Sequence, residues 1–139
     1  MSSGITLSKH LSPQTEGERD RMSLTPYASA VGSLMYAMLC TRPDIAYALS
    51  VVSRYQSDPG KSHWITVKNI LKYLQRTKDI NLIFDSASLG LEAYADLSFQ
   101  VDIDDSKSTS GFVFTLGGGA VSWRSSKQET VADSTMEAE

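Results

Sequence analysis

Two acidic residues near the C-terminal end of the sequence have the types and settings that suit a divalent metal ion. Asp96 lies where apolar and polar residues alternate as in a β-strand, and Glu139 ends a helix-prone stretch. Carboxylates are the ligands that Mg²⁺ prefers, and carboxylate-held Mg²⁺ supports phosphodiester hydrolysis. Alternation puts Asp96 on the same strand face as Tyr94 and Ser98. A helix carrying Glu139 must cover that face for the two acids to share an ion.

The surrounding pattern predicts the elements that would position these acids. Residues 91–99 form an expected strand, and residues 111–116 and 120–124 form a hairpin around the glycines at 117–119. The triple glycine precedes a strand and lacks a following Lys-Ser or Lys-Thr pair. A turn is therefore favoured over a phosphate-binding loop. From about residue 130 the sequence turns helical.

The first half of the chain is predicted to be helical. Apolar and small residues recur at helical spacing over residues 26–39, and a second helix opens at Pro43 and runs to the stop at 58–60. A third helix covers residues 62–76, with Trp64 as a core anchor. Its basic residues are expected to form a solvated face rather than a nucleic-acid contact; they are Lys68, Lys72 and Arg76.

The order of these elements predicts an α+β chain in three parts. Residues 1–24 are polar and are expected to form a flexible tail. Residues 25–90 are expected to form a helical region that ends with a short strand at 80–84, and residues 91–139 to form a sheet and the start of a helix.

Composition excludes several classes of protein. Hydrophobic residues make up 41% of the 139 residues, which is enough for a core, and the net charge of −3 gives no overall attraction to nucleic acid. Cys40 is the single cysteine and is expected in the core; His10 and His63 are too far apart in the sequence for a zinc signature. His63 is expected to be a surface or capping residue. The chain shows no secretory signal or membrane span, so we expect an intracellular protein, cytoplasmic or nuclear.

Two polar segments have alternative interpretations. The acidic loop of Asp102, Asp104 and Asp105 could mimic a Ca²⁺ loop, but it lacks the ligand spacing and the closing Glu, so a solvated turn is favoured. Residues 107–110 and Arg124 could meet phosphates or 2′-hydroxyl groups, and they equally suit a turn and a polar strand face.

A set of short motifs in a fixed order resembles the ribonuclease H domain of copia-type retrotransposon polyproteins and the region before it. The resemblance covers nearly the whole chain after about residue 7. The downstream motifs are Tyr94-Ala95-Asp96, Lys107-Ser108-Thr109-Ser110-Gly111, Leu116-Gly117-Gly118, Ser122-Trp123, Ser126-Lys127-Gln128 and Ser134-Thr135-Met136-Glu137-Ala138-Glu139. The upstream motifs are Tyr27-Ala28-Ser29-Ala30-Val31-Gly32-Ser33-Leu34-Met35-Tyr36, Thr41-Arg42-Pro43-Asp44-Ile45-Ala46, His63-Trp64 and Ile70-Leu71-Lys72-Tyr73-Leu74.

The resemblance implies a partial ribonuclease H-like fold, with a three-stranded antiparallel sheet and the start of the first helix. It implies a nuclease that cuts the RNA strand of an RNA–DNA hybrid with two Mg²⁺ ions held by four carboxylates. Asp96 matches the first-strand aspartate and Glu139 the first-helix glutamate of that catalytic and metal-binding set. The implied partners are an RNA–DNA hybrid and the reverse transcriptase domain of the parent polyprotein, and no membrane.

The sequence departs from the family in two ways. The family pattern Asp-Ala-Asp-Trp reads Asp96-Leu97-Ser98-Phe99 here, and the two remaining aspartates of the set do not occur within the 139 residues. We therefore expect a C-terminally truncated fragment that is inactive as an isolated chain. Two alternatives stay open. One is a non-catalytic nucleic-acid-binding or structural remnant, and the other is a degenerate reading frame without a role.

Overall fold

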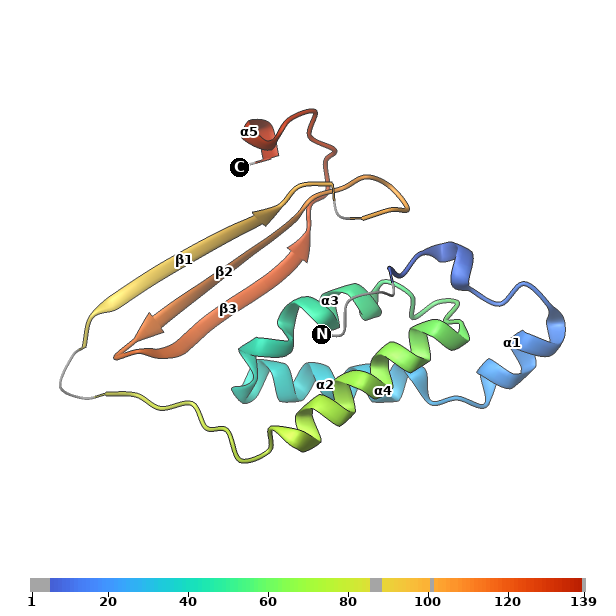
Figure 1. Ribbon diagram of the computed structural model, residues 1–139, viewed down its shortest axis with the longest axis horizontal. Helices are drawn as coiled ribbons and strands as arrows, with labels where there is room; N and C mark the ends of the chain where they lie inside the picture. Colours follow the sequence, from blue (N-terminus) through green and yellow to red (C-terminus); the bar gives the residue numbers. More distant parts are fainter. Residues whose placement is uncertain (1–5, 86–88, 101, 139) are drawn as a thin grey trace.

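The computed structural model describes residues 6–85, 89–100 and 102–138. A helical half comes first in the chain, and a sheet of three antiparallel strands follows it, so the fold is α+β as predicted. Figure 1 shows the sheet beside the helices, with β3 nearest to them and β1 farthest away. Within the described ranges, no helix has the length and apolar character needed to cross a membrane.

Three helices supply the core of the helical half. They are α2 (Tyr27–Thr41), α3 (Ala46–Ser53), which is preceded by the 3₁₀ turn η2 (Pro43–Ile45), and α4 (Lys61–Arg76). Val31, Leu49 and Val67 come from these three helices and pack in one buried cluster. Apolar side chains at helical spacing produce this packing, which confirms the three predicted helices.

His63 and Trp64 fix the start of α4. The Nδ1 atom of His63 accepts the backbone N–H of Gly60 at 2.9 Å, so His63 is a capping residue, but it is fully buried rather than on the surface. Its ring stacks on Tyr55 with a centroid distance of 4.1 Å. Trp64 packs against the core and lies 6.3 Å from the ring of Tyr27, as expected for an anchor.

The sheet is a simple meander of β1 (Leu91–Ser98), β2 (Thr109–Leu116) and β3 (Gly119–Lys127). The glycines at the β2–β3 turn have positive φ angles, +55° at Gly117 and +76° at Gly118, which confirms the predicted hairpin turn. The register shifts after Phe114, where β3 carries an irregularity.

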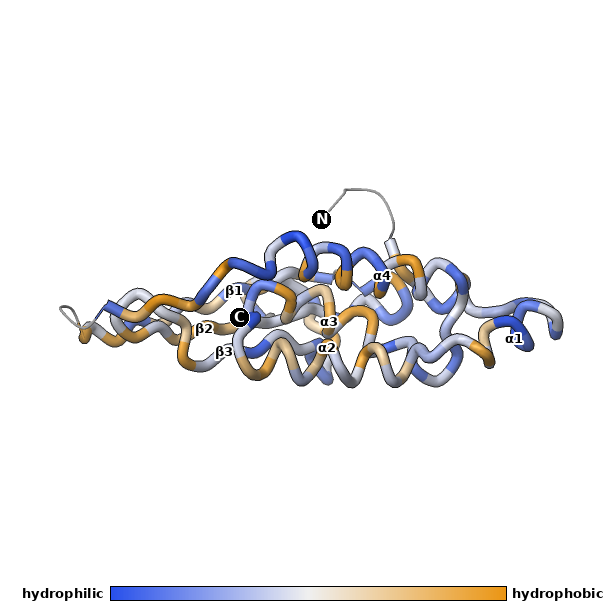
Figure 2. The backbone as a smooth tube through the Cα atoms, turned by 90° about the horizontal axis from the view of Figure 1, so that it is seen from below, coloured by the Kyte–Doolittle hydropathy of each residue, from blue (hydrophilic) through white to orange (hydrophobic). Residues whose placement is uncertain are grey.

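The two faces of the sheet have different surroundings. Trp123 and Ser125 of β3 face the helices, since the indole N–H of Trp123 donates to the sulfur of Met38 at 3.4 Å and Ser125 Oγ lies 3.5 Å from Ser50 Oγ. Phe112 and Phe114 of β2 lie on the other face, with 39% and 38% of their surfaces exposed. Figure 2 shows hydrophobic residues along the strands as well as along the helices.

Three expectations for local structure are wrong. The expected flexible tail contains the 3₁₀ turn η1 (Lys9–Leu11) and the helix α1 (Glu16–Ser23), and Leu7 packs in the helical core. The expected strand at 80–84 is extended chain without strand pairing. Cys40 is exposed rather than in the core, because the apolar helix α2 turns this side chain to its outer face.

Candidate functional site

Asp96 lies in the middle of β1 and is exposed. In the strand register it is opposite Gly111 of β2, which is in turn opposite Ser125 of β3. Directly opposed residues of antiparallel strands share a face, so Asp96 is on the face of the sheet that continues toward the helices. Gly111 places no side chain beside Asp96, and a Cβ at this position would lie 3.2 Å from the backbone oxygen of Arg124.

Glu139 lies outside the described residues, so its distance from Asp96 stays a prediction. The chain before it forms α5 (Thr135–Ala138), which begins where the sequence predicted a helix. Ser134 Oγ accepts the N–H of Glu137 at 3.2 Å, and the Glu137 carboxylate accepts the N–H of Asp133 at 2.8 Å. These bonds cap the start of the helix. Figure 1 shows α5 at the end of the sheet where β1 finishes.

The described residues alone do not assemble a complete metal site. Across 6–85, 89–100 and 102–138, no group of three or more His, Cys, Asp or Glu side chains is placed to hold a metal ion. Asp96 offers one carboxylate, and Mg²⁺ requires several oxygen ligands in octahedral geometry. The pairing of Asp96 with Glu139 as metal ligands therefore stays a prediction.

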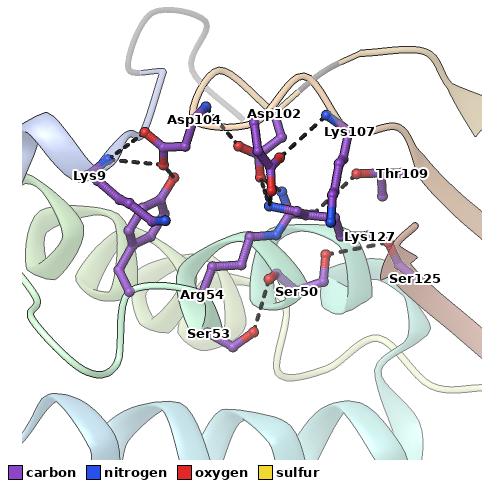
Figure 3. A network of polar contacts seen from close by, with 12 residues as sticks. Lys9, Ser50, Ser53, Arg54, Asp102, Asp104, Lys107, Thr109, Ser125 and Lys127 are labelled. Atoms are coloured by element: carbon purple, nitrogen blue, oxygen red, sulfur yellow. Dashed lines mark hydrogen bonds and ion pairs between the residues drawn. The ribbon is translucent and has the colours of Figure 1, made fainter. Parts of the chain in front are cut away.

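The acidic loop is not the solvated turn that the sequence favoured. Asp102 has only 6% of its surface exposed. Its carboxylate accepts bonds from Arg54 at 2.6 Å and from Lys127 at 2.8 Å, as Figure 3 shows. Sequence reasoning missed this arrangement because Arg54 is far away in the chain, at the end of α3. The only local signal was the abundance of acids.

We name Arg54, Asp102, Asp105, Thr109 and Lys127 the polar clasp. Lys127 also bonds Asp105 at 2.6 Å, and Arg54 donates to Thr109 Oγ1 at 3.2 Å. These contacts join the end of α3, the β1–β2 loop and the start of β2 to the end of β3. The polar clasp thereby fixes the sheet that carries Asp96 to the helical half.

A second set of bonds holds the same loop to the N-terminal segment. The Asp104 carboxylate accepts the backbone N–H of Lys9 at 2.9 and 3.0 Å and the hydroxyl of Tyr55 at 3.3 Å. Burial, together with the charges of Asp104 and Asp102, raises the pKa of Tyr55 well above its usual range. The loop therefore contacts two separate parts of the helical half, the N-terminal segment and the end of α3.

The electrostatics of the polar clasp favour the charged forms of Asp102 and Lys127. Burial on its own would raise the pKa of Asp102, but the bonds from Lys127, from the N–H of Asp104 and from Arg54 outweigh it and hold this pKa below its usual range. Burial on its own would lower the pKa of Lys127, and its bonds to Asp102 and Asp105 instead raise it. Asp102 and Lys127 are thus a pair of opposite charges at neutral pH.

The polar residues that could meet nucleic acid divide into accessible and inaccessible groups. Ser108 is fully buried, and its hydroxyl accepts the N–H of Gln100 at 3.2 Å, so it is not available to a ligand. Thr109 is buried in the polar clasp. Arg124 is exposed on β3. The basic residues of α4 are also exposed, as expected for a solvated face; they are Lys68, Lys72 and Arg76.

Comparison with known proteins defines the class: the chain is similar to retrovirus-related Pol polyproteins of transposons. It is 52% identical over 135 residues to the polyprotein of transposon TNT 1-94 from Nicotiana tabacum. The aligned region covers 97% of this chain and 10% of that protein. It is 40% identical over 116 residues to the polyprotein of transposon RE2 from Arabidopsis thaliana, covering 83% of this chain and 8% of that one. A protein named secreted RxLR effector protein 161 from Plasmopara viticola is 48% identical over 119 residues, 85% of this chain and 84% of its own length.

The chain belongs to the copia-type retrotransposon Pol polyprotein family. The chain spans about a tenth of the length of the tobacco polyprotein. No family model matches the sequence, and no solved structure matches it.

Proposed function

We propose that this chain forms the connecting region and the first three strands of a ribonuclease H domain, and that its role is in the hydrolysis of RNA–DNA hybrids. The observation that carries the proposal is the placement of Asp96. It is exposed at the middle of the first strand of an antiparallel meander, opposite a glycine, and the start of a helix follows the third strand. This is the arrangement that the sequence resemblance implies for the first catalytic carboxylate.

In this proposal Asp96 and Glu139 are catalytic residues and Mg²⁺ ligands that further carboxylates complete. Bound Mg²⁺ would activate water and stabilise the leaving oxygen of the RNA strand. The chain's own contribution is to hold the Asp96 carboxylate on a strand paired with β2, and the polar clasp stabilises the sheet behind it. We expect the 139-residue chain alone to bind Mg²⁺ weakly or not at all, because it carries only two ligands of the set.

The proposed partners are an RNA–DNA hybrid and the reverse transcriptase domain of the same polyprotein. A net charge of −3 provides no general attraction to nucleic acid, so contacts to the hybrid would depend on local cations. Arg124 is exposed, but it is opposite Phe112 in the strand register and so lies on the face away from Asp96. The proposed place of action is inside the cell, in the cytoplasm or nucleus, where an RNA template is copied.

A chimeric polyprotein tests this function. The chain replaces the matching segment of the tobacco polyprotein, to which it is 52% identical, and cleavage of a labelled RNA–DNA hybrid is measured with Mg²⁺. The chimera should cut the RNA strand, and Asp96→Asn should lower the rate by at least about 100-fold, because a lost ligand disturbs metal geometry. Glu92→Gln, on the same face of β1, is the matched control and should keep the rate. Equal rates for Asp96→Asn and the unaltered chimera would refute the assignment.

A non-catalytic nucleic-acid-binding or structural module is the second candidate, and two observations favour it. Ser98 stands where the family has a second acid, and a protein of similar extent exists in Plasmopara viticola, 84% of which this chain covers. Such a module should bind a hybrid with an affinity that falls as salt rises, and it should leave the hybrid uncut. The chimera separates the two candidates, because only the nuclease loses cleavage with Asp96→Asn.

A further inference from the structure

One face of α4 carries a row of positive charge. Four cations of this helix are exposed, and we name them the basic stripe: Lys61, Lys68, Lys72 and Arg76. The segment 59–78 contains no acid, although the chain as a whole has 16 acids against 13 lysines and arginines. Positive charge is therefore concentrated on one helix of a chain whose net charge is negative.

Helix geometry places the basic stripe opposite the core. At about 100° per residue, its four positions fall within about 80° of one another around the axis of α4. The buried residues of the helix lie on the opposite side; they are His63, Val67 and Ile70. Figure 2 shows hydrophilic residues along the outer side of α4. The basic stripe therefore points away from α2 and α3, and it extends over about 22 Å.

The basic stripe is not neutralised within the protein. Across residues 6–85, 89–100 and 102–138, the carboxylates that form ion pairs contact other cations. Arg42, Arg54 and Lys127 each lie 2.6–2.8 Å from a carboxylate oxygen. The four cations of the basic stripe have no such partner in the part of the chain that the structure describes, so their charge is available to a ligand.

The arrangement of the basic stripe is unfavourable for a helix that only faces water. Lys68, Lys72 and Arg76 follow one another at four-residue spacing, and like charges at this spacing destabilise a helix. The first turn holds Lys61 and no acid, although the helix dipole favours negative charge there. The sequence predicts a solvated face here, and exposure alone fits both roles. The charge pattern favours a polyanionic ligand, which would offset both unfavourable features.

We propose that the basic stripe binds the sugar-phosphate backbone of the RNA–DNA hybrid; this inference rests on the proposed function for the identity of the nucleic acid. One strand carries a charge about every 3.4 Å, so a stripe of about 22 Å faces about six phosphates. Asn69 and Gln75 are exposed beside the stripe and can donate to phosphate or sugar oxygens. Such contacts position the hybrid without reading its sequence.

The net negative charge of the chain does not prevent this contact. At 0.1 M salt, exposed charges more than about 10 Å apart are largely screened from each other. Attraction at short range is therefore decided by the local cations of the basic stripe rather than by acids elsewhere.

An anionic membrane is the other polyanion that a basic helix can meet. A helix that binds a membrane surface inserts its apolar face among the lipids. In α4 that face is occupied, because Val67 is fully buried and Ile70 is 6% exposed in the core of the helical half. Nucleic acid is therefore favoured over a membrane.

Fluorescence anisotropy with a labelled RNA–DNA hybrid tests the proposal. In EDTA, the logarithm of the affinity should fall with the logarithm of the salt concentration with a slope of about −3 to −4, as four phosphate contacts require. Lys68→Gln combined with Lys72→Gln should lower the affinity at least about tenfold at about 50 mM salt and reduce the slope by about 2. Lys9→Gln combined with Arg19→Gln removes the same charge from exposed positions outside the basic stripe. This control should change the affinity by less than about twofold.

Lys72→Glu separates binding from a structural role of the stripe. It turns two like-charge pairs of α4 into opposite-charge pairs, so the midpoint of urea denaturation should stay equal or rise. The affinity for the hybrid should fall more than with Lys72→Gln. A loss of stability that accompanies the loss of binding would assign the effect to folding and overturn the proposal.

Binding in EDTA and cleavage by the chimera can fail separately. Stripe-dependent binding together with a chimera that does not cut would support this proposal and refute the nuclease function. Three results would overturn the proposal: no binding to the hybrid at low salt, equal losses in the stripe and control variants, or binding to phosphatidylserine vesicles without binding to the hybrid.

Discussion

At the scale of single residues, two buried polar side chains connect parts of the chain that are far apart in sequence. Asp102 joins the β1–β2 loop to Arg54 of the helical half and to Lys127 of β3. His63 closes the start of α4 and bonds the N-terminal segment, with Nε2 3.1 Å from the carbonyl oxygen of Ser8. Each side chain satisfies buried partners that would otherwise lack a bond.

Removing the charge of Asp102 should destabilise the protein. Asp102→Asn leaves the side chains of Arg54 and Lys127, which are 18% and 26% exposed, without their shared anion. We expect the free energy of unfolding to fall by about 2–3 kcal/mol, measured by urea denaturation. Asp79→Asn, at an exposed position, is the control and should change it by less than about 0.5 kcal/mol. Similar losses in both variants would show that the polar clasp does not stabilise the fold.

Stability should also decrease in mild acid because of His63. Burial lowers the pKa of His63, although the Ser8 carbonyl and the charges of Asp104 and Asp58 partly oppose this. The unfolded chain therefore binds more protons than the folded chain below the ordinary histidine pKa of about 6.5. The stabilising contribution of neutral His63 is complete above about pH 6.5 and is lost as the pH falls through the lowered value.

Urea denaturation at several pH values measures this effect. The unaltered chain should lose stability between about pH 7 and pH 5, and His63→Gln should show a flatter dependence in the same range. Protonation of Asp102, whose pKa is lowered, should reduce the stability only in stronger acid, below the ordinary aspartate pKa of about 3.9. An unchanged slope for His63→Gln would assign the acid sensitivity to other groups.

At the scale of elements, the β2–β3 turn shows how tightly one hairpin is specified. Gly117 and Gly118 both have positive φ, which favours glycine. Gly117 also contacts the segment before the sheet, since the N–H of Asp85 donates to its carbonyl oxygen at 2.8 Å. Both glycines therefore adopt a left-handed backbone conformation. Gly117 alone also leaves no room for a side chain, because the backbone of Asp85 lies against it.

A matched pair of variants separates the two requirements. Gly118→Ala has no neighbour within 4 Å of the new Cβ, so only the backbone strain remains, about 1 kcal/mol. Gly117→Ala adds a Cβ that would lie 2.4 Å from the backbone oxygen of Asp85, so the turn or the segment must move. We expect Gly117→Ala to lower the free energy of unfolding clearly more than Gly118→Ala. Equal losses would mean that the segment at Asp85 does not pack against the turn.

The elements also show what the sequence could and could not predict. Helical spacing and Pro43 located the helices, and the glycines located the hairpin, because these signals act between near neighbours. The burial of Asp102 depends on Arg54, 48 residues away, and no local pattern reports such a contact. Cys40 has apolar neighbours, but its exposure depends on which face of α2 the other helices cover. For the candidate site, the strand of Asp96 was predicted correctly, and its relation to Glu139 stays a prediction.

At the scale of the whole molecule, the helical half and the sheet differ in packing. Every residue of the main buried cluster in the described chain lies in the helical half or the segment before it, and β1 is exposed over most of its length. The sheet is held by its own hydrogen bonds, by contacts of β3 with α3 and by the polar clasp. We infer that the sheet is the less stable half.

Hydrogen exchange checks this inference. Amides of α3 and α4 should exchange more slowly than those of β1, because opening the helices exposes the core. Asp102→Asn should accelerate exchange in the strands and leave α4 nearly unchanged. Equally slow exchange throughout would show that the sheet and the helices open only together.

Paramagnetic broadening tests the proposed metal site most directly. With ¹⁵N-labelled chain and increasing Mn²⁺ in place of Mg²⁺, the amide signals of Asp96 and Glu139 should broaden together, at the high Mn²⁺ concentration that a weak site of two carboxylates requires, because both carboxylates hold one ion. Asp96→Asn should remove the broadening at both residues, and the signal of the exposed Asp79 should stay sharp until far more Mn²⁺ is present. Broadening at Asp96 with an unaffected Glu139, or at Glu139 alone, would contradict a shared metal site.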